Sequence, residues 1–190
     1  MRKILLPLAA VGTMLFITPA AAQRVAVLVV DTDRILNECT ACKAAGVTIQ
    51  GQITAGRTRA QQLNTQWQTE EKSLETAVSA LAGKQPDAAL NQRIQRYQAG
   101  RQQGQNELAQ KENQIQSIQA NVQQQIAARV VVISEQVRAR RQADIVVGKN
   151  ATLASNSGSD ITAEVLTALN QQLPSVSATP LPQQARPAGR

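Results

Sequence analysis

Apolar residues recur at seven-residue intervals through the middle of the chain. The first series is Ile53, Ala60, Trp67, Leu74 and Leu81, and the second is Ile94, Leu108, Ile115 and Val122. Such a repeat places its members on one face of an α-helix and is typical of a coiled-coil seam. The seam is imperfect, because Gly56 and Glu70 stand where a second apolar residue is expected. The pattern predicts two long helices with one apolar stripe each.

A break between the two series lies at residues 83–87. Gly83 follows the last apolar residue of the first series, and Pro86 and Asp87 precede the second series. Glycine commonly ends helices, whereas proline and an acidic residue are common where helices begin. We therefore expect an antiparallel coiled-coil hairpin over residues 43–142, with the two stripes facing each other. Residues 43–83 would extend about 60 Å as a helix, so the hairpin should project.

The flanking segments predict a small body that contains short strands. Residues 25–30 form a β-branched apolar run typical of a buried strand. Residues 144–147 and 151–154 flank a glycine-containing turn and predict a β-hairpin, and Asp160 is placed to cap a short helix over 161–170.

The fold class is thus mainly α with a small β part, in which residues 23–42 and 143–170 form the body. A unit of this size is marginally stable alone, and open strand edges readily pair with other chains. We therefore expect the body to form oligomers.

The two ends of the chain predict segments outside this fold. Residues 1–22 have the basic start, apolar centre and small-residue end of a secretory signal peptide. Their apolar stretch is shorter than the roughly 20 residues that span a membrane. Residues 171–190 carry four prolines and predict a disordered tail. The product is expected to be exported, which in a Gram-negative bacterium means the periplasm.

Composition excludes several classes of enzyme. The 190 residues include no histidine and only one Phe, one Trp and one Tyr. Histidine is the commonest general acid or base and the commonest metal ligand, so serine–histidine hydrolases and most zinc enzymes are excluded. No glycine-rich phosphate loop is present. The sequence favours a protein that is not an enzyme and has no cofactor.

Glutamine dominates the predicted hairpin, with 22 Gln among residues 43–142. Glutamine favours helix and keeps the surface hydrated without charge. Trp67 and Tyr97 lie on the seam, where helix packing is the expected role and contact with a bound protein is the alternative. Each helical glycine costs up to about 1 kcal/mol relative to alanine. Five glycines are therefore expected to loosen the helices: Gly46, Gly51, Gly56, Gly100 and Gly104.

The net charge is +7, from 20 Lys and Arg against 13 Asp and Glu. Basic clusters attract acidic protein segments or anionic membrane surfaces, although solvated helix faces are the alternative. Nucleic acid is not an expected partner, because the chain is exported and has too few aromatic residues for a stacking platform. The candidate contacts have few acidic neighbours along the sequence and are Arg57, Arg59, Lys84, Arg93, Arg96 and Arg101.

Cys39 and Cys42 form a Cys-x-x-Cys motif between the first strand and the first long helix. Redox-active motifs occur in this setting, so a thiol–disulfide oxidoreductase is one interpretation. The alternating βαβ pattern of such enzymes is missing from the sequence, and no second motif completes a zinc site. A local disulfide, or two free thiols, is therefore favoured.

Two stretches of the body resemble a known family. Asp31–Glu38 follows the first strand with the pattern D-x-x-R-I-L-N-E, and Asp160–Asn170 begins with D-I-T. Together with the export signal and the glutamine-rich hairpin, they resemble the Skp/OmpH family of periplasmic chaperones over residues 24–170. The cysteine pair and the proline-rich tail depart from the usual family pattern.

The resemblance implies a homotrimer in which three hairpins extend like tentacles from a central β body around a cavity. It also implies binding of unfolded outer-membrane proteins without ATP and, in some members, contact with lipopolysaccharide or anionic lipid. The prediction is an ATP-independent periplasmic holdase. The alternatives are a periplasmic coiled-coil scaffold and, less favoured, an oxidoreductase that uses Cys39 and Cys42.

Overall fold

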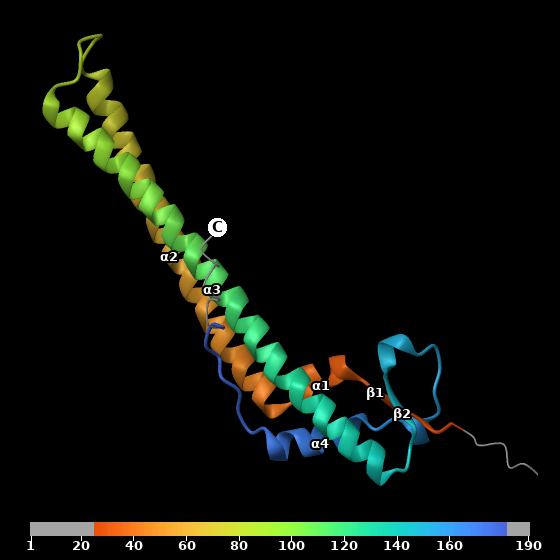
Figure 1. Cartoon of the computed structure of the whole chain (residues 1–190). Coiled ribbons are helices and arrows are strands. Elements are labelled where there is room, and N and C mark those ends of the chain that lie inside the picture. The colour runs from red at the N-terminus through yellow and green to blue at the C-terminus, as the bar shows by residue number, and fades with distance from the viewer. Residues whose placement is uncertain (1–24, 182–190) are drawn as a thin grey trace, which may run out of the picture.

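The computed structural model describes residues 25–181, which form a long helical hairpin attached to a small body (Figure 1). The hairpin consists of α2 (Thr40–Ser79) and α3 (Ala88–Arg140). The predicted fold class, mainly α with a small β part and a projecting hairpin, is confirmed. The predicted signal peptide, residues 1–22, lies outside the described residues.

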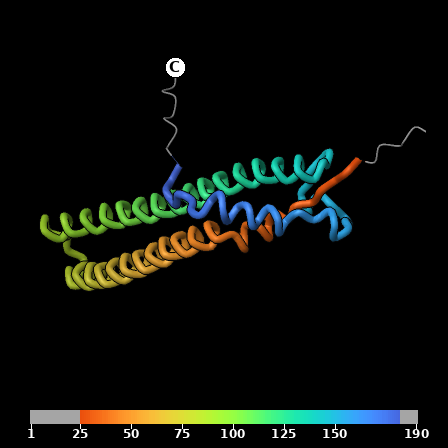
Figure 2. The backbone as a smooth tube through the Cα atoms, turned by 90° about the horizontal axis from the view of Figure 1, so that it is seen from below, coloured from red at the N-terminus to blue at the C-terminus, as the bar shows by residue number. Residues whose placement is uncertain are grey.

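The two long helices lie side by side along the hairpin (Figures 1 and 2). They contain 40 and 53 residues, which corresponds to about 60 and 80 Å at 1.5 Å per residue. Ile53 and Ile115, expected to face each other, line the same cleft between the helices. Between residues 51 and 110 the buried residues are Leu63, Leu74 and Gly104, so the distal arm is held by a thin seam.

The connection between α2 and α3 occupies residues 80–87, close to the predicted turn. Gly83 has a φ of +88°, a conformation that glycine adopts without steric cost. Asp87 caps α3, because its Oδ1 accepts a hydrogen bond from the Leu90 N–H at 2.7 Å. The sequence signals for the end of one helix and the start of the next therefore lie where the chain turns.

The body contains a two-stranded parallel sheet in place of the predicted β-hairpin. β1 (Val27–Val30) pairs with β2 (Ile145–Gly148), and Val27 lies opposite Ile145. Among the described residues, 151–154 form no strand, and Lys149–Ala151 is a 3-10 turn. The prediction of a hairpin across residues 144–154 is wrong.

Local geometry explains this difference. Gly148 has φ −69° and ψ 142°, an extended conformation that does not reverse the chain. Leu153 is fully exposed, so a strand over residues 151–154 would have no apolar surface to bury. Parallel strands need a long crossover connection, and here the whole hairpin supplies it. The sheet consequently holds the two ends of the arm together.

Two shorter helices, α1 (Thr32–Glu38) and α4 (Thr162–Gln172), complete the body. α1 was not predicted from the sequence. Its first turn is capped by Asp31, whose Oδ1 accepts a hydrogen bond from the Arg34 backbone N–H at 2.9 Å. The N-cap of α4 is Ile161 and not the predicted Asp160, because the helix begins at Thr162. The Asp160 carboxylate still accepts a hydrogen bond from the Thr162 N–H at 2.9 Å. α4 packs on α3, and α1 packs on α2 and α4. Together they enclose one apolar core, whose fully buried members include Ile35, Ile133, Val137, Val165 and Leu169.

The segment after α4 differs from the predicted disordered tail. Residues 171 and 172 belong to α4, and residues 173–181 run along the arm (Figures 1 and 2). Leu173, Val176 and Ala178 pack against the core. These contacts account for the ordered path: Leu173 precedes the first proline of the segment, and Val176 and Ala178 lie between Pro174 and Pro180. Residues 182–190 lie outside the described residues.

Candidate functional site

Two of the six basic residues singled out by the sequence join the helices of the arm. Arg59 binds Glu107 through two hydrogen bonds of 2.9 and 3.0 Å. Arg93 binds Glu70 in the same bidentate geometry, through hydrogen bonds of 2.7 and 3.0 Å. The hydrogen bonds from the arginines lower the pKa of each glutamate below its ordinary value. Glu70, which interrupts the apolar repeat, therefore stabilises the contact between the helices.

A third basic residue, Arg101, packs against the two aromatic rings of the arm. Its guanidinium carbon lies 5.7 Å from the centre of the Trp67 ring and 5.8 Å from that of Tyr97. These distances are within the range of cation–π attraction. Trp67 and Tyr97 are both half-buried between the helices, which agrees with the packing role expected for them.

The other three basic residues, Lys84, Arg57 and Arg96, are exposed. They form no ion pair within residues 25–181. Lys84 lies in the turn at the tip, and Arg57 borders the cleft between α2 and α3. The structure thus divides the predicted basic set into three residues that hold the arm together and three that face solvent.

Gly104 has a role that the sequence analysis did not assign. A Cβ atom at this position would lie 2.5 Å from the Trp67 ring and 3.3 Å from Leu63. Glycine is therefore needed for the close approach of α3 to α2, and the expectation that Gly104 loosens the arm is wrong. The other four helical glycines have no atom within 4 Å of such a Cβ. Only the contact with Trp67 in the folded structure distinguishes Gly104 from the other four glycines.

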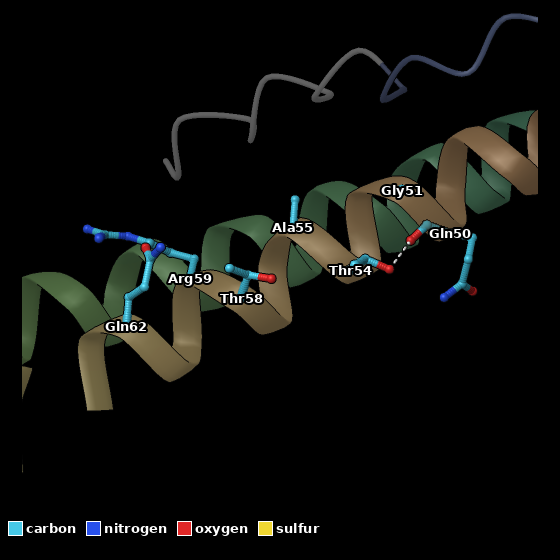
Figure 3. A pocket seen from close by; sticks show the side chains of 7 residues that line it. All are labelled: Gln50, Gly51, Thr54, Ala55, Thr58, Arg59 and Gln62. Carbon is cyan, nitrogen blue, oxygen red and sulfur yellow. Dashed lines mark hydrogen bonds between the residues drawn. The ribbon is translucent and has the colours of Figure 1, made fainter. Parts of the chain in front are cut away.

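A shallow depression runs along one face of α2 (Figure 3). It arises because small residues, Gly51, Thr54, Ala55 and Thr58, lie between longer polar side chains. The Thr54 hydroxyl donates to the Gln50 backbone oxygen at 2.9 Å. The depression contains no arrangement suited to catalysis. Among the described residues, no group of three or more potential metal ligands occurs.

Cys39 and Cys42 form a disulfide at the junction of α1 and α2, with a Cα–Cα distance of 5.1 Å. Cys39 is fully buried and Cys42 is nearly so. The Cys39 sulfur also accepts a hydrogen bond from the Cys42 N–H at 2.9 Å, which caps α2. Reactive cysteines are normally partly exposed, so this burial favours a structural role at the root of the arm.

An apolar surface lies beside the free edge of β2. In the part of the chain that the structure describes, β2 pairs only with β1. Ile145 on this strand is 45% exposed, and Val131 on the neighbouring part of α3 is 68% exposed. A cleft of about 550 Å³ between β2 and α3 is lined by Val130 and Val147 among others. The body therefore leaves both hydrogen-bonding groups and apolar side chains uncovered.

Comparison with known proteins shows which family has this architecture. The family model described as outer membrane protein (OmpH-like) matches residues 26–169. The chain belongs to the OmpH-like family. The match covers the whole hairpin and the body as far as residue 169. The OmpH-like chaperone family is not a family of enzymes. No curated protein matches this sequence.

A crystal structure from Caulobacter crescentus, provisionally described as an OmpH-like outer membrane chaperone, has a similar fold. It is 20% identical in sequence, with a TM-score of 0.60, and the alignment covers 93% of this chain and 100% of that one. Because of this coverage, the OmpH-like fold extends over nearly all the described residues.

No helix among residues 25–181 has the length and apolar character required to cross a membrane.

Proposed function

We propose that this OmpH-like protein is an ATP-independent holdase that binds unfolded outer-membrane proteins in the periplasm and prevents their aggregation. The observation that carries the proposal is the projecting hairpin, which presents long exposed helix faces outside any compact core. Many weak contacts along such faces suit a client without a fixed shape. Membership of a chaperone family supports the same function.

A trimer is part of this proposal. The free edge of β2 and the exposed Ile145 and Val131 would be covered by neighbouring copies. Association removes apolar area from water, which contributes about 25 cal/mol per Å², and closes a strand edge that otherwise invites aggregation. Three copies would place three arms around a shared space in which a client is shielded.

Lys84, Arg57 and Arg96 are the basic residues that we assign to client contact. They are exposed and unpaired within the described residues, so their charge acts on approaching molecules. Acidic client segments, and the anionic surface of lipid or lipopolysaccharide, would be attracted by them. Arg59, Arg93 and Arg101 act mainly within the arm.

Aggregation of a denatured porin, followed by light scattering after dilution, tests the proposed function. The purified protein without ATP is expected to suppress the scattering at a molar ratio near three chains per client. A periplasmic scaffold, the second candidate, would leave aggregation unchanged, and that result would refute the holdase.

The disulfide provides a separate test against an oxidoreductase. Changing Cys39 and Cys42 to alanine should lower the free energy of unfolding by about 2 kcal/mol through loss of the short closed loop. Loss of the buried sulfur atoms and of the cap on α2 should lower it further. Suppression of porin aggregation should remain once the folded fraction, measured by circular dichroism, is matched. Complete loss of activity in a folded variant would show that the cysteines take part in function.

A further inference from the structure

Residues 173–181, which we call the strap, lie against a row of polar side chains on α3. The row consists of Ser117, Asn121 and Gln125, which are four residues apart and so share one face of the helix. Figure 2 shows the strap leaving α4 and running along the arm. We call the three side chains the ladder.

Each member of the ladder binds the main chain of the strap. The Gln125 side-chain amide accepts from the Ser177 N–H at 3.0 Å and donates to the Ser177 carbonyl at 3.0 Å. Asn121 donates to the Thr179 carbonyl at 2.8 Å. The Leu181 N–H donates to the Ser117 hydroxyl at 2.9 Å. None of these bonds uses a side chain of the strap, so the ladder recognises backbone groups.

The spacing of the ladder matches an extended peptide. Four residues of helix rise about 6 Å, and two residues of extended chain rise about 6 to 7 Å. Every second strap residue, 177, 179 and 181, therefore meets every fourth helix residue. Because the match depends on backbone geometry alone, it applies to any extended chain that runs in this direction.

Side chains of the strap alternate in the same register. Val176 and Ala178 pack against the apolar core, whereas Ser177 and Thr179 are exposed. Pro174 and Pro180, which have no N–H, fall at positions where the ladder needs no donor. The site thus accepts an extended segment in which small apolar residues alternate with polar ones.

We propose that the ladder is a binding site for extended polypeptide and that the strap covers it as an internal occupant. The ligand class is a peptide with alternating apolar and polar residues, which is the pattern of transmembrane β-strands. The next ladder position, Asn113, borders a cleft beside Leu181 together with Gln110 and Gln114. This cleft continues the polar row beyond the strap.

The identity of the natural ligand rests on the proposed function, because only a holdase would meet unfolded β-strands. The binding site itself rests on the contacts between the strap and α3. An unfolded client segment that reaches the ladder must displace the strap. The strap is therefore expected to lower the affinity for clients until a competing segment replaces it.

Hydrogen exchange tests the contacts in the full-length protein. The amides of Ser177 and Leu181 should exchange at least tenfold more slowly than in a free peptide of residues 173–181. The double change Asn121→Ala and Gln125→Ala should remove most of this protection. A matched change of the exposed Gln119 and Gln123 to alanine should leave it intact. Unprotected amides in the unmodified protein would overturn the proposal.

Peptide binding tests the site in trans. Changing Val176 and Ala178 to aspartate in the full chain places charges against the core and releases the strap. A fluorescent peptide of residues 173–181 should bind this variant at least tenfold more tightly than the unmodified protein, as measured by anisotropy. Adding the Asn121→Ala and Gln125→Ala changes to this variant should abolish the gain in affinity for the peptide. Binding that is insensitive to those changes would overturn the proposal.

The porin aggregation assay, run on the same variants, separates this inference from the proposed function. The released-strap variant should suppress aggregation at a lower concentration than the unmodified protein, and the added ladder changes should reverse that gain. If all variants suppress aggregation equally, the ladder is not a client site, while the holdase function stands. If the peptide binds through the ladder but no variant suppresses aggregation, the site stands and the holdase function fails.

Discussion

At the scale of single residues, Gly104 determines how closely the two arm helices approach. The Trp67 ring and Leu63 occupy the space that any larger residue would need. The Arg101 guanidinium carbon lies over the same ring, 5.7 Å from its centre. A cluster of four residues thus provides a close contact in a seam that is otherwise thin.

Replacing Gly104 with alanine should destabilise the arm relative to the same change at Gly100. Alanine favours helix over glycine by about 1 kcal/mol, so Gly100→Ala, at an open position, should stabilise. At Gly104 the added methyl group displaces Trp67, and overpacking of this kind costs about 1 to 3 kcal/mol. Urea unfolding monitored by Trp67 fluorescence, at one protein concentration, measures the difference. Equal stabilisation by both changes would contradict the assigned role.

At the scale of elements, ion pairs add to the weak apolar seam. Arg59–Glu107 and Arg93–Glu70 each join α2 to α3 at points well separated along the arm. Both glutamates have a lowered pKa in the folded protein because arginine donates to them. Their proton affinity is therefore higher in the unfolded chain than in the folded one.

This difference in pKa predicts that the arm loses stability in acid. The contribution of the two pairs is complete above the pKa of an unfolded glutamate, about 4.3, and disappears as the pH falls through the lower folded values. Urea midpoints from circular dichroism should decrease between about pH 5 and pH 3.

Charge-removing variants provide the control for this pH effect. Changing Glu70 and Glu107 to glutamine should reduce the acid decrease. The decrease that remains comes from other carboxylates whose pKa is lowered by hydrogen bonds from arginine, such as Glu135 and Glu164. The matched change of Glu71 and Glu112, which are exposed and form no ion pair among the described residues, should preserve the full decrease. An identical pH profile for both pairs of variants would show that the ion pairs do not stabilise the arm.

The elements differ in how far the sequence could predict them. The helices of the arm and the turn at Gly83 and Asp87 follow from local signals, namely the apolar repeat and the stop and start residues. The pairing of β1 with β2 could not be predicted, because the partners are separated by the entire arm. A short apolar run near a glycine resembles half of a hairpin, and no local signal distinguishes it from a strand with a distant partner.

The candidate site could be predicted only in part, because its contacts also join residues that are distant in the sequence. Charge gaps along the sequence identified six basic residues, but only the fold shows that Glu70 and Glu107 neutralise two of them. The ladder was also invisible, because its glutamine and asparagine resemble many others on the arm. The alternation of Val176 and Ala178 with polar residues was the one local signal for an ordered strap.

At the scale of the whole molecule, the division between paired and free basic residues predicts two separable effects. Changing Lys84, Arg57 and Arg96 to glutamine should slow association with an acidic denatured porin about tenfold at low salt, with little change in stability. The same change at Arg59, Arg93 and Arg101 should lower the urea midpoint instead. Stopped-flow fluorescence measures the rates, and equal slowing by both triple variants would refute the assignment.

The holdase account requires that separate copies of this chain enclose one client. Sedimentation velocity of the purified protein mixed with a denatured porin measures both the assembly and its cargo. The account predicts one soluble species with the mass of three chains plus one porin, and a species of three chains when the porin is omitted. A protein that remains monomeric, or a porin that still sediments as aggregate in the mixture and apart from the protein, would contradict the account.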